Sequence, residues 1–297
     1  MAKKKKVSFK ISKLLFGELA VLILLTLVLI YSNTRVYQSR KMEADSVKSI
    51  GTSANNVSPT PTKPVMEIPE ASGRRIRVPI LMYHYIGGNP NPEDIGRDNL
   101  SVSPEKFDEQ MEYLSKNGYT PITLDTMVAG LSGQITLPEK TLILTFDDGY
   151  MDFYLNAFPI LQKYGFKSVL FVPTGFMGKT AYLTWDQLDK LQGSGLVSIQ
   201  AHTFNHAHLP SLSEDQIKFE LIESKRALEQ RYTIPVNFIA YPYGASNQAI
   251  WNLTKKAGYL GALGTWSSVI QSEGTIFDMP RIKIGGSFDL NQFAIAI

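Results

Sequence analysis

Apolar residues in the second part of the chain form short continuous runs that alternate with stretches of helical periodicity. Such runs predict buried strands, because the strands of a parallel sheet are covered on both faces. They lie at Val78–Tyr83, Leu142–Phe146, Ser168–Val172, Val197–Gln200, Asn237–Ala240, Leu260–Leu263 and Ile282–Ile284. Strands that alternate with helices predict βα units around a parallel sheet, which forms either a barrel or an open doubly wound sheet.

The helical segments carry recognisable start signals. Phe107, Met111 and Leu114 repeat at i, i+4 and i+7, which is one face of a helix, and Ser103 followed by Pro104 is typical of its first turn. Further helices are predicted at Ala157–Tyr164, after Thr184, after Ser213 and at Ala249–Ala257. Chemistry in such α/β folds gathers where strands end and loops begin, so polar residues at strand ends are the candidates for function.

The N-terminus has a different pattern. Lys3–Lys6 precede an apolar stretch from Leu14 to Tyr31, which approaches the 20 or so residues that cross a bilayer. Lysines stay on the cytoplasmic side, so the rest of the chain is expected outside the cell. We predict a cytoplasmic segment at 1–13, a single-pass membrane anchor at 14–32, a flexible linker at 33–77 that is rich in Ser, Thr, Asn and Pro, and a catalytic domain at 78–297. A cleaved signal peptide is the alternative for the apolar stretch.

Charge and composition exclude several classes. Six of the 30 Lys and Arg and one of the 27 acids lie in residues 1–32, which leaves 24 basic and 26 acidic residues in the remainder. A nearly neutral body argues against nucleic acid as a partner, since phosphate binding needs a basic face. The chain has no cysteine, which excludes disulfides, zinc thiolates and cysteine nucleophiles.

Three polar clusters follow directly on predicted strands. In the first, Asp147 and Asp148 precede Gly149, and the glycine permits a bend that could turn both carboxylates into one site. An ordinary Asp-Asp-Gly turn is the alternative. In the second, His202 and His206 have an i, i+4 spacing, which would place both imidazoles on one face of a helical turn.

The third cluster is Tyr241–Gly244, a Tyr-Pro-Tyr-Gly turn that could aim a backbone N–H at a developing oxyanion. Two histidines and one aspartate would form a metal site with open positions for water. A metal that activates water, a free carboxylate that accepts its proton and a fixed donor for the anion together predict metal-assisted acyl hydrolysis.

With these motifs the chain resembles the polysaccharide deacetylase (NodB-homology) family of carbohydrate esterases, and within it the poly-N-acetylglucosamine deacetylase-like subgroup. The motifs Thr145–Gly149, His202–His206 and Tyr241–Gly244 carry the resemblance, and the flanking segments Val78–His84 and Leu183–Leu188 agree with it. It covers roughly Val78 to the end of the chain. The resemblance implies an irregular (β/α) barrel of parallel strands and a bound divalent metal, zinc as a rule and cobalt or nickel in some members.

The resemblance also implies roles. Asp147 would be the catalytic base, the backbone N–H of Tyr243 would form the oxyanion hole, and the metal would be held by Asp148, His202 and His206. The sequence departs from the family pattern where Ala240 stands in place of an arginine and where no histidine follows His208. His84 is the candidate general acid in place of the missing histidine, or else a structural histidine. Arg281 is the candidate partner of Asp147 in place of the missing arginine, or else a surface charge.

The resulting expectation is a membrane-anchored hydrolase that removes N-acetyl groups from N-acetylglucosamine units of a cell-wall or surface polysaccharide, such as peptidoglycan or poly-N-acetylglucosamine. An O-acetyl esterase acting on acetylated xylan or a similar glycan would use the same residues. A carbohydrate-binding protein without catalysis is the third interpretation, although all three clusters keep the residues that catalysis requires.

Overall fold

A sheet of parallel strands forms the centre of the computed structural model, which describes residues 73–90 and 93–297. The strand order is β10, β9, β8, β7, β6, β2, β12, and β5 pairs with β6 as an additional neighbour. Their bounds are β2 Ile80–Tyr83, β5 Thr120–Pro121, β6 Thr141–Phe146, β7 Ser168–Val172, β8 Val197–Ala201, β9 Phe238–Ala240, β10 Gly261–Leu263 and β12 Ile282–Lys283. All seven predicted strands are present.

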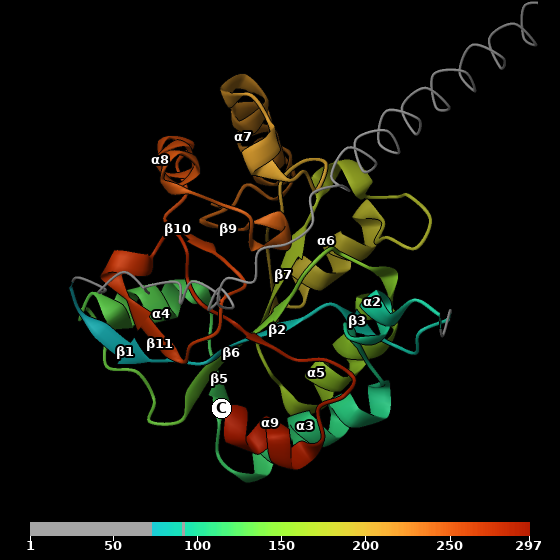
Figure 1. The fold of residues 1–297 in the computed structure, drawn as a ribbon. Coiled ribbons are helices and arrows are strands. Elements are labelled where there is room, and N and C mark those ends of the chain that lie inside the picture. Colours follow the sequence, from blue (N-terminus) through green and yellow to red (C-terminus); the bar gives the residue numbers. More distant parts are fainter. Residues whose placement is uncertain (1–72, 91–92) are drawn as a thin grey trace, which may run out of the picture. The chain divides into compact units, whose positions relative to one another are not determined.

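The curved sheet makes a half-barrel (Figure 1). The segment from Met279 to Lys283 runs along its open side, where Met279 bridges to Leu263 of β10 and β12 pairs with β2. The predicted parallel α/β architecture is therefore confirmed, in the form of a half-barrel.

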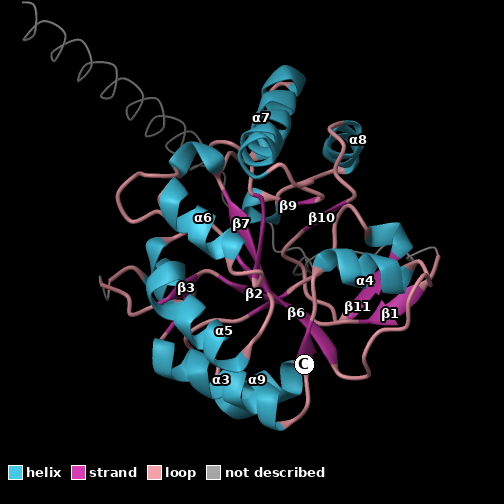
Figure 2. Ribbon diagram, turned by 180° about the vertical axis from the view of Figure 1, so that it is seen from behind, coloured by secondary structure: helices cyan, strands magenta, loops and turns pink. Residues whose placement is uncertain are grey.

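Helices surround the strands, as Figures 1 and 2 show. They are α2 Ile95–Asp98, α3 Pro104–Lys116, α4 Leu124–Leu131, α5 Phe158–Tyr164, α6 Trp185–Gly193, α7 Glu214–Tyr232, α8 Gln248–Lys256 and α9 Leu290–Ala296. Ser103, Thr184 and Ser213 each accept a hydrogen bond from the backbone N–H three residues later, as their predicted capping roles require. Short helical turns are η1 Phe153–Ala157, η2 Thr174–Phe176, η3 Leu209–Ser211, η4 Pro242–Gly244 and η5 Glu273–Thr275.

Three pieces of paired structure were not predicted from the sequence. β1 (Arg75–Arg77) pairs antiparallel with β11 (Ile270–Ser272), and β3 (Tyr85–Ile86) pairs with β4 (Ser101–Val102). The third is β5. These strands are two or three residues long, too short to produce a recognisable hydrophobic pattern.

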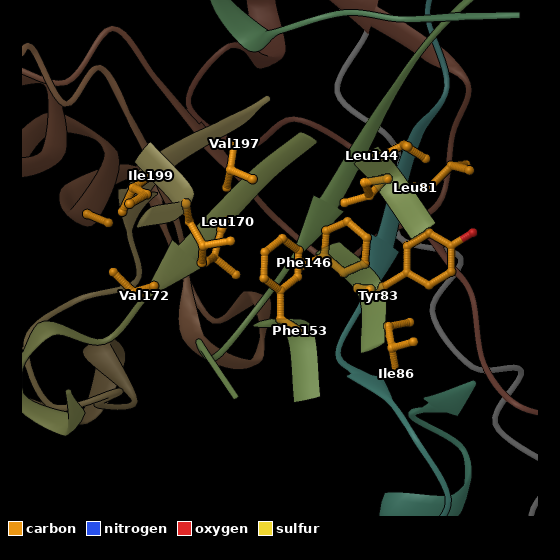
Figure 3. Close-up of a cluster of buried hydrophobic side chains, with 14 of the residues drawn as sticks. Leu81, Tyr83, Ile86, Leu144, Phe146, Phe153, Leu170, Val172, Val197 and Ile199 are labelled. Atoms are coloured by element: carbon orange, nitrogen blue, oxygen red, sulfur yellow. The ribbon is translucent and has the colours of Figure 1, made fainter. Parts of the chain in front are cut away.

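Alternate strand residues face two separate cores, because successive side chains of a strand point to opposite faces. Ile80, Ile143, Val169, Phe171 and Phe238 belong to the core inside the curved sheet. Their neighbours along the strands pack in the larger core between the strands and the helices (Figure 3), together with residues of α3, α5, α6 and α7.

Aromatic rings form the centre of the larger core. Phe146 stacks on Tyr83 with ring centroids 5.2 Å apart, and it meets Phe153 edge-on at 4.8 Å (Figure 3). The Tyr83 hydroxyl donates to Gln110 Oε1 at 2.8 Å, so the one polar atom of this ring is satisfied. The packing fixes the end of β6, which is the strand that leads into Asp147 and Asp148.

The predicted basic segment at 1–13 and the predicted anchor at 14–32 lie outside the described residues. Within the described part of the chain, no helix is long and apolar enough to cross a membrane. The last residues of the predicted linker are described, and Arg75–Arg77 are a paired strand there instead of a flexible tether.

Replacing Phe146 with Ala should destabilise the protein by about 3–5 kcal/mol, because the cavity forms among rings that cannot collapse into it. Ile295 is 86% exposed on α9, so Ile295→Ala is a matched control and should change the free energy of unfolding by less than about 0.5 kcal/mol. Urea unfolding measures both. Equal losses would contradict the assignment of this core.

Candidate active site

Polar side chains replace apolar ones at the carboxyl ends of the central strands. Asp147 continues β6 on the inner face, two residues after the buried Thr145, and His202 follows β8 two residues after the buried Gln200. Asp147 N–H donates to the Tyr83 carbonyl and His202 N–H to the Val172 carbonyl, so both residues are still held by neighbouring strands. The sheet therefore brings them to a single edge.

Asp147 forms a two-pronged ion pair with Arg281, whose side chain is fully buried. Arg281 Nη1 donates to Asp147 Oδ1 and Nη2 donates to Oδ2, both at 2.7 Å. The guanidinium also donates to the Gly264 carbonyl through Nε and to Thr145 Oγ1 through Nη1. Burial alone would raise the pKa of Asp147, but the charge and hydrogen bonds of Arg281, together with the charges of His202 and His84, outweigh it and the pKa is lowered. The carboxylate is therefore ionised at neutral pH.

Asp148 leaves the strand direction through a left-handed turn. Its φ is 74° and that of Gly149 is 66°, so the bend begins one residue before the glycine that predicted it. The turn brings Asp148 Oδ1 to 3.2 Å from Nε2 of His202 and 3.0 Å from Nε2 of His206. Asp147 therefore binds Arg281, whereas Asp148 lies against the two histidines.

The tautomer of His202 is set by a backbone carbonyl. Its Nδ1 lies 2.7 Å from the Ala240 oxygen, and since a carbonyl only accepts, Nδ1 carries a hydrogen. In the neutral imidazole, Nε2 then has a lone pair directed at Asp148 Oδ1, which is buried and has no hydrogen-bond partner. Two buried acceptors at this distance require a proton or a cation between them.

The spacing of these atoms suits one metal ion. The three ligand atoms of Asp148, His202 and His206 all lie within 4.8 Å of one another. Two ligands that each lie about 2.0–2.2 Å from one tetrahedral zinc ion are about 3.3–3.6 Å apart, slightly more than the observed separations of 3.2 and 3.0 Å. The carbonyl bond to the other nitrogen of His202 is also the usual support of a metal-binding histidine.

The predicted helical turn between His202 and His206 is wrong. The segment is a loop in which Thr203 and His206 have positive φ values, 62° and 54°. The two imidazoles nevertheless converge, with ring centroids 4.8 Å apart. The i, i+4 spacing predicted the meeting of the rings but not the backbone that produces it.

His84 and Tyr243 lie beside the same group. His84 directly follows β2, and its Nδ1 is buried without a hydrogen-bond partner. Burial lowers its pKa, although the charges of Asp147 and Asp148 act in the opposite direction. Tyr243 is 67% exposed, and its ring lies 4.9 Å from that of His206. Its φ of 61° is strained for a non-glycine residue, and the hydrogen bonds of this turn use the N–H groups of Gly244 and Ala245 instead of its own. All seven predicted site residues therefore gather at one edge of the half-barrel.

Sequence reasoning missed two contributors. The carbonyl of Ala240 orients His202 although its side chain has no polar atom, and nothing in the sequence signals this. A row of aromatic rings was also missed: Tyr85 stacks on Tyr150 at 4.0 Å, and Tyr150 contacts Tyr182 at 5.2 Å. The sequence signal for this row was that Tyr150 directly follows Gly149, at the end of the first polar cluster.

Comparison with known proteins agrees with this geometry. The family model described as polysaccharide deacetylase matches residues 134–262, which include both aspartates and both histidines. The solved Streptococcus pyogenes deacetylase PplD in complex with acetate is 31% identical, with a TM-score of 0.69, over 74% of this chain and 98% of that one. The chain belongs to the polysaccharide deacetylase family.

Two curated relatives extend the likeness. The putative polysaccharide deacetylase YxkH of Bacillus subtilis is 28% identical over 221 residues, which are 74% of this chain and 76% of that protein. The poly-β-1,6-N-acetyl-D-glucosamine N-deacetylase of Escherichia coli is 26% identical over 249 residues, but the match spans only 37% of its length. As a polysaccharide deacetylase the protein is a hydrolase, and Asp148, His202 and His206 supply the donor set that a metal-dependent member needs.

Replacing Arg281 with Met should cost about 3–5 kcal/mol of stability, because Asp147 is left as a buried charge without its partner. The double variant Arg281→Met, Asp147→Leu should lose less than the single one, since no charge remains buried. Urea unfolding of both variants gives the comparison. A single variant that loses under about 1 kcal/mol would contradict the buried pair.

Zinc affinity of this polysaccharide deacetylase should rise with pH. Burial alone would lower the pKa of His202, but Asp148 and Asp147 more than offset it and raise the pKa. Below that raised pKa a proton occupies Nε2 and competes with the ion, so affinity should fall by up to about tenfold per pH unit for each proton displaced. Titration calorimetry in buffers of different ionisation enthalpy would detect the released protons. A pH-independent affinity between pH 5 and 8 would contradict this competition.

Proposed function

We propose that this polysaccharide deacetylase removes N-acetyl groups from N-acetylglucosamine units of a cell-wall or surface polysaccharide. The observation that carries the proposal is the convergence of an ionised aspartate, Asp147, with a separate Asp-His-His group at one edge of the sheet. Hydrolysis of an unactivated amide needs both a base and an electrophile, and this edge offers one of each.

Asp148, His202 and His206 would hold the metal, and zinc is the proposed ion. A divalent ion bound there supplies Lewis-acid chemistry, since it lowers the pKa of water and polarises the acetyl carbonyl. The residues fit it because their three donor atoms face one point, while the buried Oδ1 of Asp148 has no hydrogen-bond partner. A set of nitrogen and oxygen donors does not favour soft ions such as Cu(I), which prefer thiolate or thioether ligands.

Asp147 would act as general base and accept a proton from the attacking water. Arg281 uses one lone pair on each carboxylate oxygen, and a carboxylate has about four such positions, so acceptors remain for water. The same ion pair keeps Asp147 ionised and makes it a weak base. Its contribution therefore depends on position more than on basicity.

Two further groups complete the proposed reaction. The N–H of Tyr243 would stabilise the anion that forms on the acetyl oxygen, and the exposed left-handed turn explains how a backbone donor can face substrate. His84 would protonate the departing sugar nitrogen as the C–N bond breaks, which leaves acetate and a free amine. Its Nδ1 is buried without a hydrogen-bond partner. Burial lowers the pKa of His84, although the charges of Asp147 and Asp148 act in the opposite direction.

The identity of the polymer is inferred from a relative, and the location of the protein is inferred from its N-terminal sequence. The Escherichia coli relative is a poly-β-1,6-N-acetyl-D-glucosamine N-deacetylase by name, and N-acetylglucosamine also occurs in peptidoglycan. The apolar stretch at 14–32 with its preceding lysines supports a single-pass anchor that holds the catalytic domain outside the cell membrane. Deacetylation there would make the polymer more cationic.

The test is acetate release from N-acetylglucosamine oligomers and peptidoglycan, with free amines counted in parallel. Wild type should release both in equal amounts after Zn²⁺ is restored to stripped protein, and Asp147→Asn should lower kcat by about 10²–10⁴ because its amide accepts no proton. Asp215→Asn, at a side chain that is 95% exposed, is the matched control.

Three outcomes would contradict the proposal. Full activity of Asp147→Asn would remove the base from the mechanism. Acetate release from acetylated xylan, with none from the N-acetylated glycans, would identify an ester substrate instead. Glycan binding without any acetate release, in protein loaded with one metal ion, would indicate a binding protein.

A further inference from the structure

A buried carboxylate lies behind the loop that carries His202 and His206. Glu220, on α7, is only 5% exposed. Its Oε2 accepts hydrogen bonds from the backbone N–H of Phe204 at 2.9 Å and of Asn205 at 2.7 Å, and its Oε1 accepts from Asn205 Nδ2 at 2.9 Å. The carboxylate therefore binds the two residues at the centre of the loop, midway between the histidines.

The opposite side of the loop is held by η2. Gly175 N–H donates to the Phe204 carbonyl at 2.8 Å, and Thr174 N–H donates to the Thr203 carbonyl at 3.3 Å. A Cβ on Gly175 would lie 2.8 Å from the Phe204 oxygen, so only glycine permits this approach. The N–H groups of the loop thus face Glu220 and its carbonyls face η2.

The loop has little internal support for its shape. Thr203 and His206 both have left-handed backbones, with φ values of 62° and 54°, and the internal hydrogen bond of the loop runs from the Ala207 N–H to Thr203 Oγ1 at 3.4 Å. Strained residues of this kind persist where the surrounding structure fixes them. Here the surrounding structure is the Glu220 carboxylate on one side of the loop and the N–H groups of η2 on the other.

We infer that Glu220 is a positioning residue for the metal site, which acts on His206 through the backbone of Phe204 and Asn205. The inference rests on the proposed metal-binding role of Asp148, His202 and His206. A buried carboxylate is tolerated because it receives three donors. A glutamine would offer one acceptor oxygen, and its NH₂ group would face an N–H or the Asn205 amide, so the loop would lose its fixed shape while α7 keeps its packing.

The experiment compares Zn²⁺ dissociation constants by chelator competition in wild type, Glu220→Gln and Glu223→Gln. Glu223 lies one turn further along α7 and bonds to Arg226, so Glu223→Gln should leave the affinity within about twofold. Glu220→Gln should weaken Zn²⁺ binding by roughly 10- to 100-fold, the usual effect of losing a group that orients metal ligands. The visible spectrum of the Co²⁺-substituted protein should change in the same variant and not in the control.

Gly175→Ala provides a second variant in case Glu220→Gln fails to fold, because its Cβ displaces the Phe204 carbonyl from the other side. It should weaken Zn²⁺ binding and alter the Co²⁺ spectrum in the same direction. Wild-type affinity and an unchanged spectrum in folded Glu220→Gln would overturn the positioning role. A wild-type protein that binds no Zn²⁺, or an Asp148→Asn variant that binds it equally well, would instead overturn the proposed metal site itself.

Discussion

The hydrogen bond from His202 Nδ1 to the Ala240 carbonyl is the constraint on which the site depends. It links the carboxyl ends of β8 and β9 and places the proton of the neutral imidazole on Nδ1. The lone pair of Nε2 is then directed at Asp148, whose Oδ1 is buried and unpartnered. This arrangement is stable only with a positive charge between the two atoms, either a proton or a metal ion. The same bond thus bears on both the proposed metal site and its expected sensitivity to pH.

The fold separates the charges that the chemistry needs. Strand alternation directs Asp147 to the inner face, where Arg281 keeps it ionised, and the left-handed turn at Asp148 directs the adjacent carboxylate to the histidines. Two neighbouring acids would otherwise raise each other's pKa. The site is therefore assembled from groups whose partners are already fixed by packing, which is how α/β proteins place catalytic groups at strand ends.

Much of this could be predicted from the sequence, and the failures have physical causes. The long strands and capped helices were predictable because burial produces regular apolar patterns, whereas β1, β3 and β5 are too short to show one. The histidine pair was recognised by its spacing, but its loop depends on Glu220 and Gly175, which lie outside the motif. Arg281 is 134 residues from Asp147, so no local pattern could join them, and only the resemblance to a family suggested the pairing.

Anomalous diffraction from crystals grown with Zn²⁺ would locate the ion independently of catalysis. We expect one strong peak within about 2.0–2.2 Å of a carboxylate oxygen of Asp148 and of Nε2 of both His202 and His206, with His202 Nδ1 still on the Ala240 carbonyl. A peak elsewhere in the described part of the chain, or a rotated His202 ring that binds through Nδ1, would contradict this expectation.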